Sequence, residues 1–205
     1  MRSTTNPLLS LRVPLILASS SPRRTQLLHQ LGIPHTVKKP AIEETIPSDL
    51  PHGQIVETLA LQKAQAVAPE YPQALTLAAD TLVVLGNEIL GKPQNEQEAY
   101  HTLKKLSGQK HTVYTGIALL HPASQRTYTT HEATQVYFAS LSDEEIWAYI
   151  QTGSPLDKAG AYGIQDDMGA LFIPRIEGDY YTVVGLPLHR FYTAIRTHFT
   201  DLLLP

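Results

Sequence analysis

A strand, a tight turn and the start of a helix follow one another in the stretch LILASSSPRRTQLL, from Leu15 to Leu28. The apolar run Pro14–Ala18 predicts a buried strand, and Pro22 suits the first position of a helix. Leucines then recur on one helical face until Gly32 ends the helix. A strand that passes directly into a helix favours an α/β architecture.

The alternation of helices and strands continues along the chain. Helical patterns are predicted at about 54–68, in NEQEAYHTLKKLSG from Asn95, in SDEEIWAYIQ from Ser142, and from Pro187 onward. Glu98 follows Asn95 by three residues and Glu145 follows Ser142 by three, which predicts a capping box at the start of each of these two helices. Strands are predicted in LTLAADTLVV, at about 112–120, at about 132–139, and in the glycine-rich stretch that follows. Gly86–Asn87 resembles a two-residue hairpin turn that leads into EILGKP. Hairpins between some strands and helices between others predict a mixed sheet.

The length of 205 residues fits a single domain over 14–205, preceded by a flexible leader over 1–13. Arg12 and Pro14 interrupt the apolar run of the N-terminal region, which argues against a signal peptide there. No apolar stretch approaches the ~20 residues of a membrane span. A net charge of −3 does not indicate a nucleic-acid or membrane-surface binder. The absence of cysteine excludes thiolate chemistry and is compatible with a reducing compartment. With neither a signal peptide nor a membrane span expected, we expect a soluble, cytoplasmic protein.

Two arginines at the start of the first helix oppose its dipole. The helix from Asn95 places acids in its first turn and lysines in its last, as the dipole favours, whereas Arg23 and Arg24 occupy a positive end. Ser19, Ser20 or Ser21 can cap this helix, and its first N–H groups lack partners within the helix. An incoming phosphate would turn the electrostatic cost into binding, since arginine grips phosphate with two hydrogen bonds. The alternative is that both arginines point into water.

Lys63 lies in the middle of an apolar helical stripe. With 100° per residue, Lys63 falls on the same face as Val56, Leu59, Ala60 and Val67. The lysine could extend its ammonium to water, but a buried ammonium more often needs an anionic partner. We therefore predict a functional or ion-paired lysine.

Asp80 interrupts the apolar strand ALTLAADTLVV. Aspartate is unfavourable in strands, and an ionised carboxylate among apolar neighbours requires a cation or a metal. The alternative is an aspartate that caps a turn at the end of the strand. The hairpin at Gly86–Asn87 can return Lys92 toward Asp80, which suits either an ion pair or a phosphate and metal site.

Weaker candidates lie in two loops. Glu43 and Glu44 form an acidic pair that could be solvated or functional, and Lys158 follows Asp157. The run GAYGIQ allows close backbone approach, and Gln165 could read a base edge with a donor and an acceptor. The histidines show no clear metal-ligand spacing, and no P-loop, GxSxG or HExxH motif is present.

Several long motifs together are similar to those of one family. The segments ASSSPRRTQLL, AADTLVV, ILGKP, LSGQKHTVYTG and DKAGAYGIQ…GDYYTVVGLPL occur in this order and closely resemble the Maf proteins. The resemblance runs from about Leu15 to near the C-terminus. It implies an α/β fold like that of the inosine-triphosphatase group (the Maf/Ham1 fold), with a mixed sheet, two lobes and a central cleft. Members are often dimeric, so a homodimer is left open.

The resemblance also implies roles for individual residues. Asp80 corresponds to the general base, and Asp80 and Glu44 to metal ligands. The positions implied to set substrate specificity are Arg23, Thr81 and Gln165. The positions implied to bind phosphate are Ser19, Ser21, Arg24, Lys63, Lys92 and, less directly, Lys158.

The implied activity is that of a nucleoside triphosphate pyrophosphatase. DKAGAYGIQ resembles the branch that acts on dTTP and UTP rather than the branch that acts on 7-methyl-GTP. The expected substrates are dTTP, UTP or modified pyrimidine nucleotides, cleaved with Mg²⁺ or Mn²⁺ to the monophosphate and pyrophosphate in a house-cleaning role. One alternative is an NTP-binding regulator of cell division or septum formation with little turnover. Another is an enzyme that removes the γ-phosphate.

Overall fold

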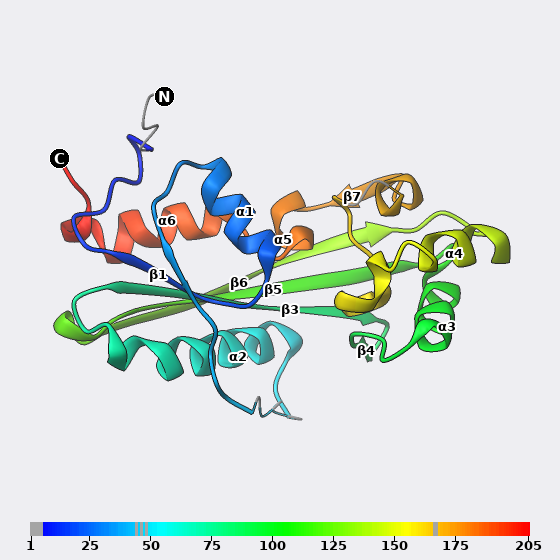
Figure 1. Cartoon of the computed structure of the whole chain (residues 1–205), viewed down its shortest axis with the longest axis horizontal. Helices are drawn as coiled ribbons and strands as arrows, with labels where there is room; N and C mark the ends of the chain where they lie inside the picture. Colours follow the sequence, from blue (N-terminus) through cyan, green and yellow to red (C-terminus); the bar gives the residue numbers. More distant parts are fainter. Residues whose placement is uncertain (1–5, 44, 46, 48, 166–167) are drawn as a thin grey trace. The chain divides into compact units, whose positions relative to one another are not determined.

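The computed structural model describes residues 6–43, 45, 47, 49–165 and 168–205. Strands alternate with helices along these residues, as the sequence predicts (Figure 1). The strands are β1 (Leu15–Ala18), β2 (Thr36–Lys38), β3 (Leu75–Leu85), β4 (Glu88–Leu90), β5 (Lys110–His121), β6 (Arg126–Tyr137) and β7 (Arg175–Glu177). The α-helices are α1 (Pro22–Gln30), α2 (His52–Val67), α3 (Glu96–Leu106), α4 (Asp143–Ile150), α5 (Tyr180–Val184) and α6 (Leu188–His198).

The strands form one seven-stranded mixed sheet. The strand order is β2-β1-β3-β5-β6-β7, and β4 pairs with β3 outside this path. β1 is parallel to both β2 and β3, because helical or irregular connections join these strands. β3 and β4 are antiparallel, as are β6 and β7. The predicted mixed α/β fold and the hairpin at Gly86–Asn87 are thus confirmed.

The chain divides into two compact units. The first contains the chain up to Asp80, Thr115–Glu132 and the segment from Gly185 onward; the second contains Thr81–Tyr114 and Ala133–Val184. Three of the divisions therefore fall inside the long strands β3, β5 and β6.

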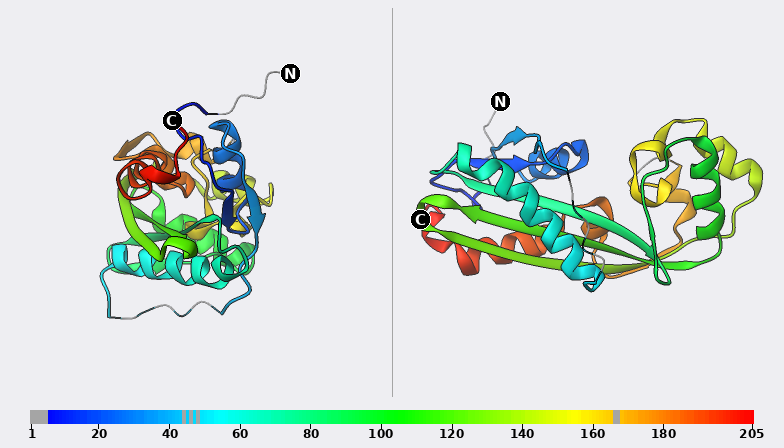
Figure 2. Two further views of the ribbon diagram at one scale, coloured as in Figure 1. Left: turned by 90° about the vertical axis from the view of Figure 1, so that its left-hand side faces the viewer. Right: turned by 90° about the horizontal axis from the view of Figure 1, so that it is seen from below.

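Helix α2 packs closely on the strands of the first unit. Figures 1 and 2 show α2 on one side of these strands and α6 on the other. Alanines at the interface, among them Ala60, Ala78 and Ala118, are fully buried. At Gly116 on β5, a Cβ atom would lie only 2.5 Å from the backbone carbonyl of Val56 on α2. The glycine therefore permits the close approach of this helix to the sheet.

The second unit has its own apolar core, and its helices begin as the sequence predicts. Leu103, Leu106, Ile146 and Tyr149 from α3 and α4 pack in this core. Ser142 caps α4 in a complete capping box with Glu145. On α3, the Asn95 side chain accepts from the Glu98 amide, but the Glu98 carboxylate accepts from the Gln94 amide rather than closing the predicted box.

The structure contains elements that the sequence pattern did not predict. Strand β2 falls where an irregular connection follows the first helix, and the glycine-rich stretch contains α5 as well as β7. Both elements are short, and β2 carries little of the apolar periodicity that marks a strand, since two of its residues are exposed.

The described part of the predicted leader, residues 6–13, contacts the C-terminal tail. The Arg12 amide donates to the Leu202 carbonyl at 2.9 Å, and the Leu204 amide donates to the Ser10 carbonyl at 2.8 Å. Leu9 is buried. No helix among the described residues has both the length and the apolar character needed to cross a membrane.

Candidate active site

A buried ion pair joins two of the predicted site residues. The Lys63 ammonium on α2 donates to Oδ1 of Asp80 on β3, with a distance of 2.5 Å between Nζ and Oδ1. Both side chains are only 12% exposed. Each charge thereby compensates the other in a poorly solvated place, which is the condition for burying either one. The prediction that Lys63 has an anionic partner is confirmed.

The local sequence explains how these two side chains meet. Val56, Leu59 and Ala60 of α2 are fully buried against the sheet, and Lys63 shares their face. Asp80 lies within β3 and not at its end, so the alternative of a turn-capping aspartate is wrong. Parallel pairing of β1 and β3 ends with Ala18 opposite Ala78, so Ser19 and Asp80 both follow the paired segment at the carboxyl end of β1. This is the edge at which open α/β sheets commonly bind ligands.

Arg24 is held by acceptors of the protein itself. Its Nε donates to the Gly185 carbonyl at 2.7 Å, and its Nη1 donates to Oγ of Ser19 at 3.2 Å. Arg24 is buried, whereas Arg23 is half-buried. The carbonyl dipole offsets part of the charge that Arg24 brings to the positive end of α1. The alternative in which both arginines point into water is therefore wrong for Arg24.

The start of α1 has no side-chain cap. Ser21 occupies the N-cap position but makes no capping hydrogen bond. The hydroxyl of Ser19 instead accepts from the Ser21 amide at 3.1 Å and from Arg24. The serine cap expected at the N-cap position is thus absent, because the Ser21 side chain makes no capping hydrogen bond.

The second unit joins the segments that carry Lys92 and Lys158. The Gly160 amide donates to the Gly91 carbonyl at 3.1 Å. Gly160 has φ +71°, and a Cβ there would lie 2.9 Å from Cγ1 of Val83, so only glycine fits without adjustment. The DKAG motif therefore lies directly against the ILGKP motif and β3.

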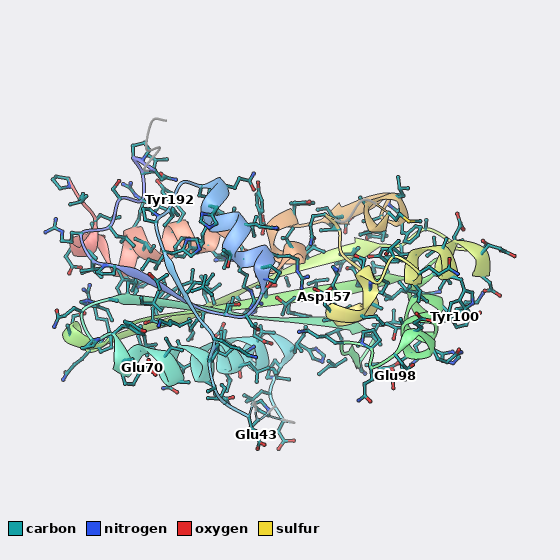
Figure 3. The ribbon with its side chains drawn as sticks, viewed as in Figure 1. Glu43, Glu70, Glu98, Tyr100, Asp157 and Tyr192 are labelled. Atoms are coloured by element: carbon teal, nitrogen blue, oxygen red, sulfur yellow. The ribbon has the colours of Figure 1, made fainter. Side chains whose placement is uncertain are left out.

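The two lysines of these segments differ in exposure. Lys92 is exposed and follows β4, whose last pair with β3 is Leu90 opposite Val83. Lys158 is buried, and its ammonium donates to the Ser154 carbonyl at 2.6 Å and to Oδ1 of Asp157 at 2.6 Å. Figure 3 labels Asp157 at the end of the short helix that precedes Lys158. Lys158 therefore stabilises its own turn, and the predicted approach of Lys92 to Asp80 stays a prediction.

The remaining predicted residues have varied surroundings. Thr81 follows Asp80 on β3 and is half-buried, and Gln165 is half-buried in the glycine-rich loop. Glu43 is exposed on the connection between β2 and α2 (Figure 3), and Glu44 lies outside the described residues.

The donor chemistry of this site suits a hard divalent cation. Nucleotide-bound Mg²⁺ is commonly held by one or two carboxylates plus phosphate oxygens, so the buried carboxylate of Asp80 is an appropriate donor. Within the described residues, no group of three or more His, Asp or Glu side chains is arranged to hold a metal.

Comparison with known proteins places the chain in a family. The family model described as "Maf-like protein" matches residues 14–198. The chain belongs to the Maf family. This match covers every candidate site residue named above, from Ser19 to Gln165.

Curated relatives of this Maf chain are similar over nearly their whole length. A protein from Salinibacter ruber named "dTTP/UTP pyrophosphatase" is 50% identical over 198 residues, which are 97% of each chain. A protein of the same name from Halalkalibacterium halodurans is 52% identical over 90% of this chain and 96% of its own. Another, from Symbiobacterium thermophilum, is 54% identical over 86% of this chain and 89% of its own.

Two solved structures are more distantly similar to this Maf chain. The Ham1 protein of Staphylococcus aureus is 14% identical, with a TM-score of 0.44 over 62% of this chain and 72% of that one. A HAM1 protein from Coxiella burnetii is 18% identical, with a TM-score of 0.44 over 63% of this chain and 74% of that one.

The sequence did not reveal several contacts of this site. The Gly185 carbonyl that accepts from Arg24 lies far along the chain, and a backbone carbonyl leaves no mark on residue type. The only sign of this contact in the sequence was that Gly185 lies in the segment GLPL, which belongs to a motif shared with the Maf proteins. The contact between Gly91 and Gly160 was likewise marked only by glycines in two separate motifs.

Proposed function

We propose that this Maf chain hydrolyses dTTP and UTP, or modified forms of these nucleotides, to the nucleoside monophosphate and pyrophosphate. The observation that carries the proposal is about 50% identity, over nearly the full chain, with proteins named dTTP/UTP pyrophosphatase. The buried pair of Lys63 and Asp80 supports it, since it places a carboxylate that can accept a proton beside an ammonium that can bind phosphate.

Asp80 is proposed as the general base. Its carboxylate takes a proton from the water that attacks the α-phosphorus, and the bond from that phosphorus to the bridging oxygen breaks to release pyrophosphate. Lys63 compensates the charge of Asp80 before substrate binds, and its ammonium is proposed to bind phosphate oxygens afterwards.

A divalent cation, Mg²⁺ or Mn²⁺, is proposed to bind Asp80 and Glu44 together with the phosphates. When bound, it would neutralise negative charge on the triphosphate. Basic residues of the chain would neutralise the rest of that charge, and those proposed are Arg24, Lys63, Lys92 and, less directly, Lys158. Ser19 and Ser21 stand at the start of α1, and the positive end of a helix favours phosphate oxygens.

Specificity is proposed to come from Arg23, Thr81 and Gln165. A hydroxyl and an amide can both donate and accept, which matches a pyrimidine ring that carries two carbonyls and one N–H group. We further propose a cytoplasmic protein with a nucleotide as its partner and without nucleic-acid or membrane partners, in line with its near-neutral charge. A homodimer fits the same family pattern.

The experiment is a panel assay. The protein is incubated with dTTP, UTP, CTP, ATP and GTP in Mg²⁺, and the products are separated by anion-exchange chromatography. TMP or UMP together with pyrophosphate supports the proposal. Nucleoside diphosphate with orthophosphate would contradict it, as would tight nucleotide binding without turnover, which is the behaviour of a regulator.

A further inference from the structure

A buried hydrogen bond outside the proposed catalytic groups joins His111 to Tyr162. His111 is the second residue of β5, and Nε2 of its ring lies 2.7 Å from the hydroxyl of Tyr162. Exposure is 2% for His111 and 5% for Tyr162. Phe138 packs against both rings, at centroid distances of 5.8 Å and 5.1 Å. Two polar groups are thus enclosed by apolar rings and depend on each other for hydrogen bonding.

Both partners are neutral near pH 7. Burial lowers the pKa of His111 to about 4 and raises the pKa of Tyr162 above its ordinary value. In the described part of the chain, Nδ1 of His111 is buried without a hydrogen-bond partner. A leucine at this position would avoid the cost of burying an unpartnered nitrogen. Packing alone would therefore favour an apolar residue over His111.

The hydrogen bond holds a segment that has other anchors as well. Tyr162 follows Gly160, whose amide donates to Gly91, and precedes Gly163, whose amide donates to the Tyr149 hydroxyl at 3.2 Å. Ala161 has φ +60°, which a residue with a side chain rarely adopts. Such a conformation persists only where its surroundings impose it, and the neighbouring anchors impose it here.

This segment connects two residues with proposed substrate roles. Lys158 precedes it and Gln165 follows it, while the His111–Tyr162 bond fixes its middle. An amide that reads a base edge must be held in place, because misplacement costs binding energy.

We infer that His111 is a positioning residue, which through the Tyr162 hydroxyl holds the Lys158–Gln165 segment in the conformation that binds the pyrimidine nucleotide. The inference rests on the proposed dTTP/UTP pyrophosphatase activity. It assigns His111 no contact with the reacting atoms. Its loss therefore weakens substrate binding and base selectivity more than it slows the chemical step.

The test compares steady-state kinetics with UTP and CTP in four variants of the full chain. Tyr162→Phe removes only the hydroxyl, and His111→Leu removes the ring nitrogens. His111→Gln keeps an amide that can bond the Tyr162 hydroxyl. His121→Leu is the matched control, because His121 is also a buried histidine of β5 and its Nδ1 is 2.7 Å from the Ser124 hydroxyl.

We expect Tyr162→Phe and His111→Leu to raise KM for UTP about fivefold, the effect of losing roughly one hydrogen bond, with kcat within about twofold of wild type. The preference for UTP over CTP should fall by a similar factor. His111→Gln should restore KM to within about twofold of wild type. His121→Leu should lower the unfolding midpoint without changing KM or selectivity.

Two results would overturn the positioning role while the wild type is active. One is a Tyr162→Phe variant whose KM for UTP and preference for UTP over CTP are unchanged. The other is a His121→Leu variant in which KM and selectivity change as much as in Tyr162→Phe, which would attribute the effect to general stability. Tyr162→Phe keeps the inference testable if His111→Leu does not fold. A wild type that releases no pyrophosphate from any nucleotide would overturn the proposed function, and with it this inference.

Discussion

The ammonium of Lys63 lies 2.5 Å from Oδ1 of Asp80, and both side chains are 12% exposed. One residue comes from the apolar face of α2 and the other from the middle of β3. Neither charge is tolerable there alone, so the pair explains why a lysine and an aspartate persist in two otherwise apolar patterns.

Replacing Lys63 alone should therefore be costly. Lys63→Met leaves the Asp80 carboxylate buried without its cation, and we expect the free energy of unfolding to fall by about 3 kcal/mol. The double variant Lys63→Met/Asp80→Asn removes both charges and should recover at least half of the loss. Urea denaturation of the two single variants and the double variant gives the coupling. A loss below about 1 kcal/mol in Lys63→Met would show that the pair is effectively solvated.

The adjacent residues Arg23 and Arg24 should contribute differently to the free energy of unfolding. Arg24→Ala removes the side-chain donor to the buried Gly185 carbonyl and one of the two donors to the Ser19 hydroxyl, with an expected loss of about 2 kcal/mol. Arg23→Ala changes a residue that is only half-buried, so its loss should be smaller than that of Arg24→Ala. Urea denaturation checks both, and equal losses would argue that the contacts of Arg24 do not stabilise the fold.

Gly160 and Gly153 form a second matched pair. Both have positive φ, +71° and +74°, so an alanine at either carries a backbone cost of about 1 kcal/mol. Only at Gly160 would the added Cβ also meet a side chain, 2.9 Å from Cγ1 of Val83. We expect Gly160→Ala to lower the unfolding free energy by about 1–2 kcal/mol more than Gly153→Ala does. If thermal or urea unfolding showed equal losses in Gly160→Ala and Gly153→Ala, the Val83 side chain would be able to move away from the added Cβ without an energetic cost.

His111 should make stability depend on pH. Burial lowers its pKa from 6.5 to about 4 in the folded chain, so between these values the unfolded chain binds more protons. The contribution of neutral His111 to the free energy of unfolding is fully present above about pH 6.5. It is lost as pH falls toward 4, and the free energy of unfolding is about 2–3 kcal/mol lower at pH 4.5 for this reason. The unfolding free energy of wild type and His111→Gln, compared at pH 7 and pH 4.5, isolates this contribution, because the carboxylates titrate in both proteins. Parallel pH profiles would mean that His111 is protonated in the folded state.

Features that depend on local signals in the sequence were predicted correctly. Hairpin chemistry at Gly86–Asn87, the capping box of Ser142 and Glu145, and the apolar stripe around Lys63 all act within a few residues, and the structure has each of them. Burial of Asp80 followed from its apolar neighbours in the same strand.

Contacts between segments far apart in the chain were harder to predict from the sequence. The sequence predicted that Lys63 and Asp80 each need a partner, but it did not pair them with each other. Packing of α2 on the sheet brings the two together, and this packing depends on the glycine at position 116, which no helical or strand periodicity reveals. The hydrogen bond from Arg24 to the Gly185 carbonyl could not be predicted from the sequence either, because any residue can supply a backbone acceptor.

Pyrophosphate release by this Maf chain is proposed to depend on Asp80 as the general base. The most direct measurement is the rate of pyrophosphate release from UTP by Asp80→Asn, which keeps the shape of the side chain and removes its basicity. Asp143→Asn is the control, because Asp143 is an exposed carboxylate that also accepts from a lysine, Lys104, at 2.6 Å. We predict at least a ~100-fold lower rate for Asp80→Asn with nucleotide binding retained, and a wild-type rate for Asp143→Asn. Near-normal pyrophosphate release by Asp80→Asn would contradict the assignment of Asp80 as the base.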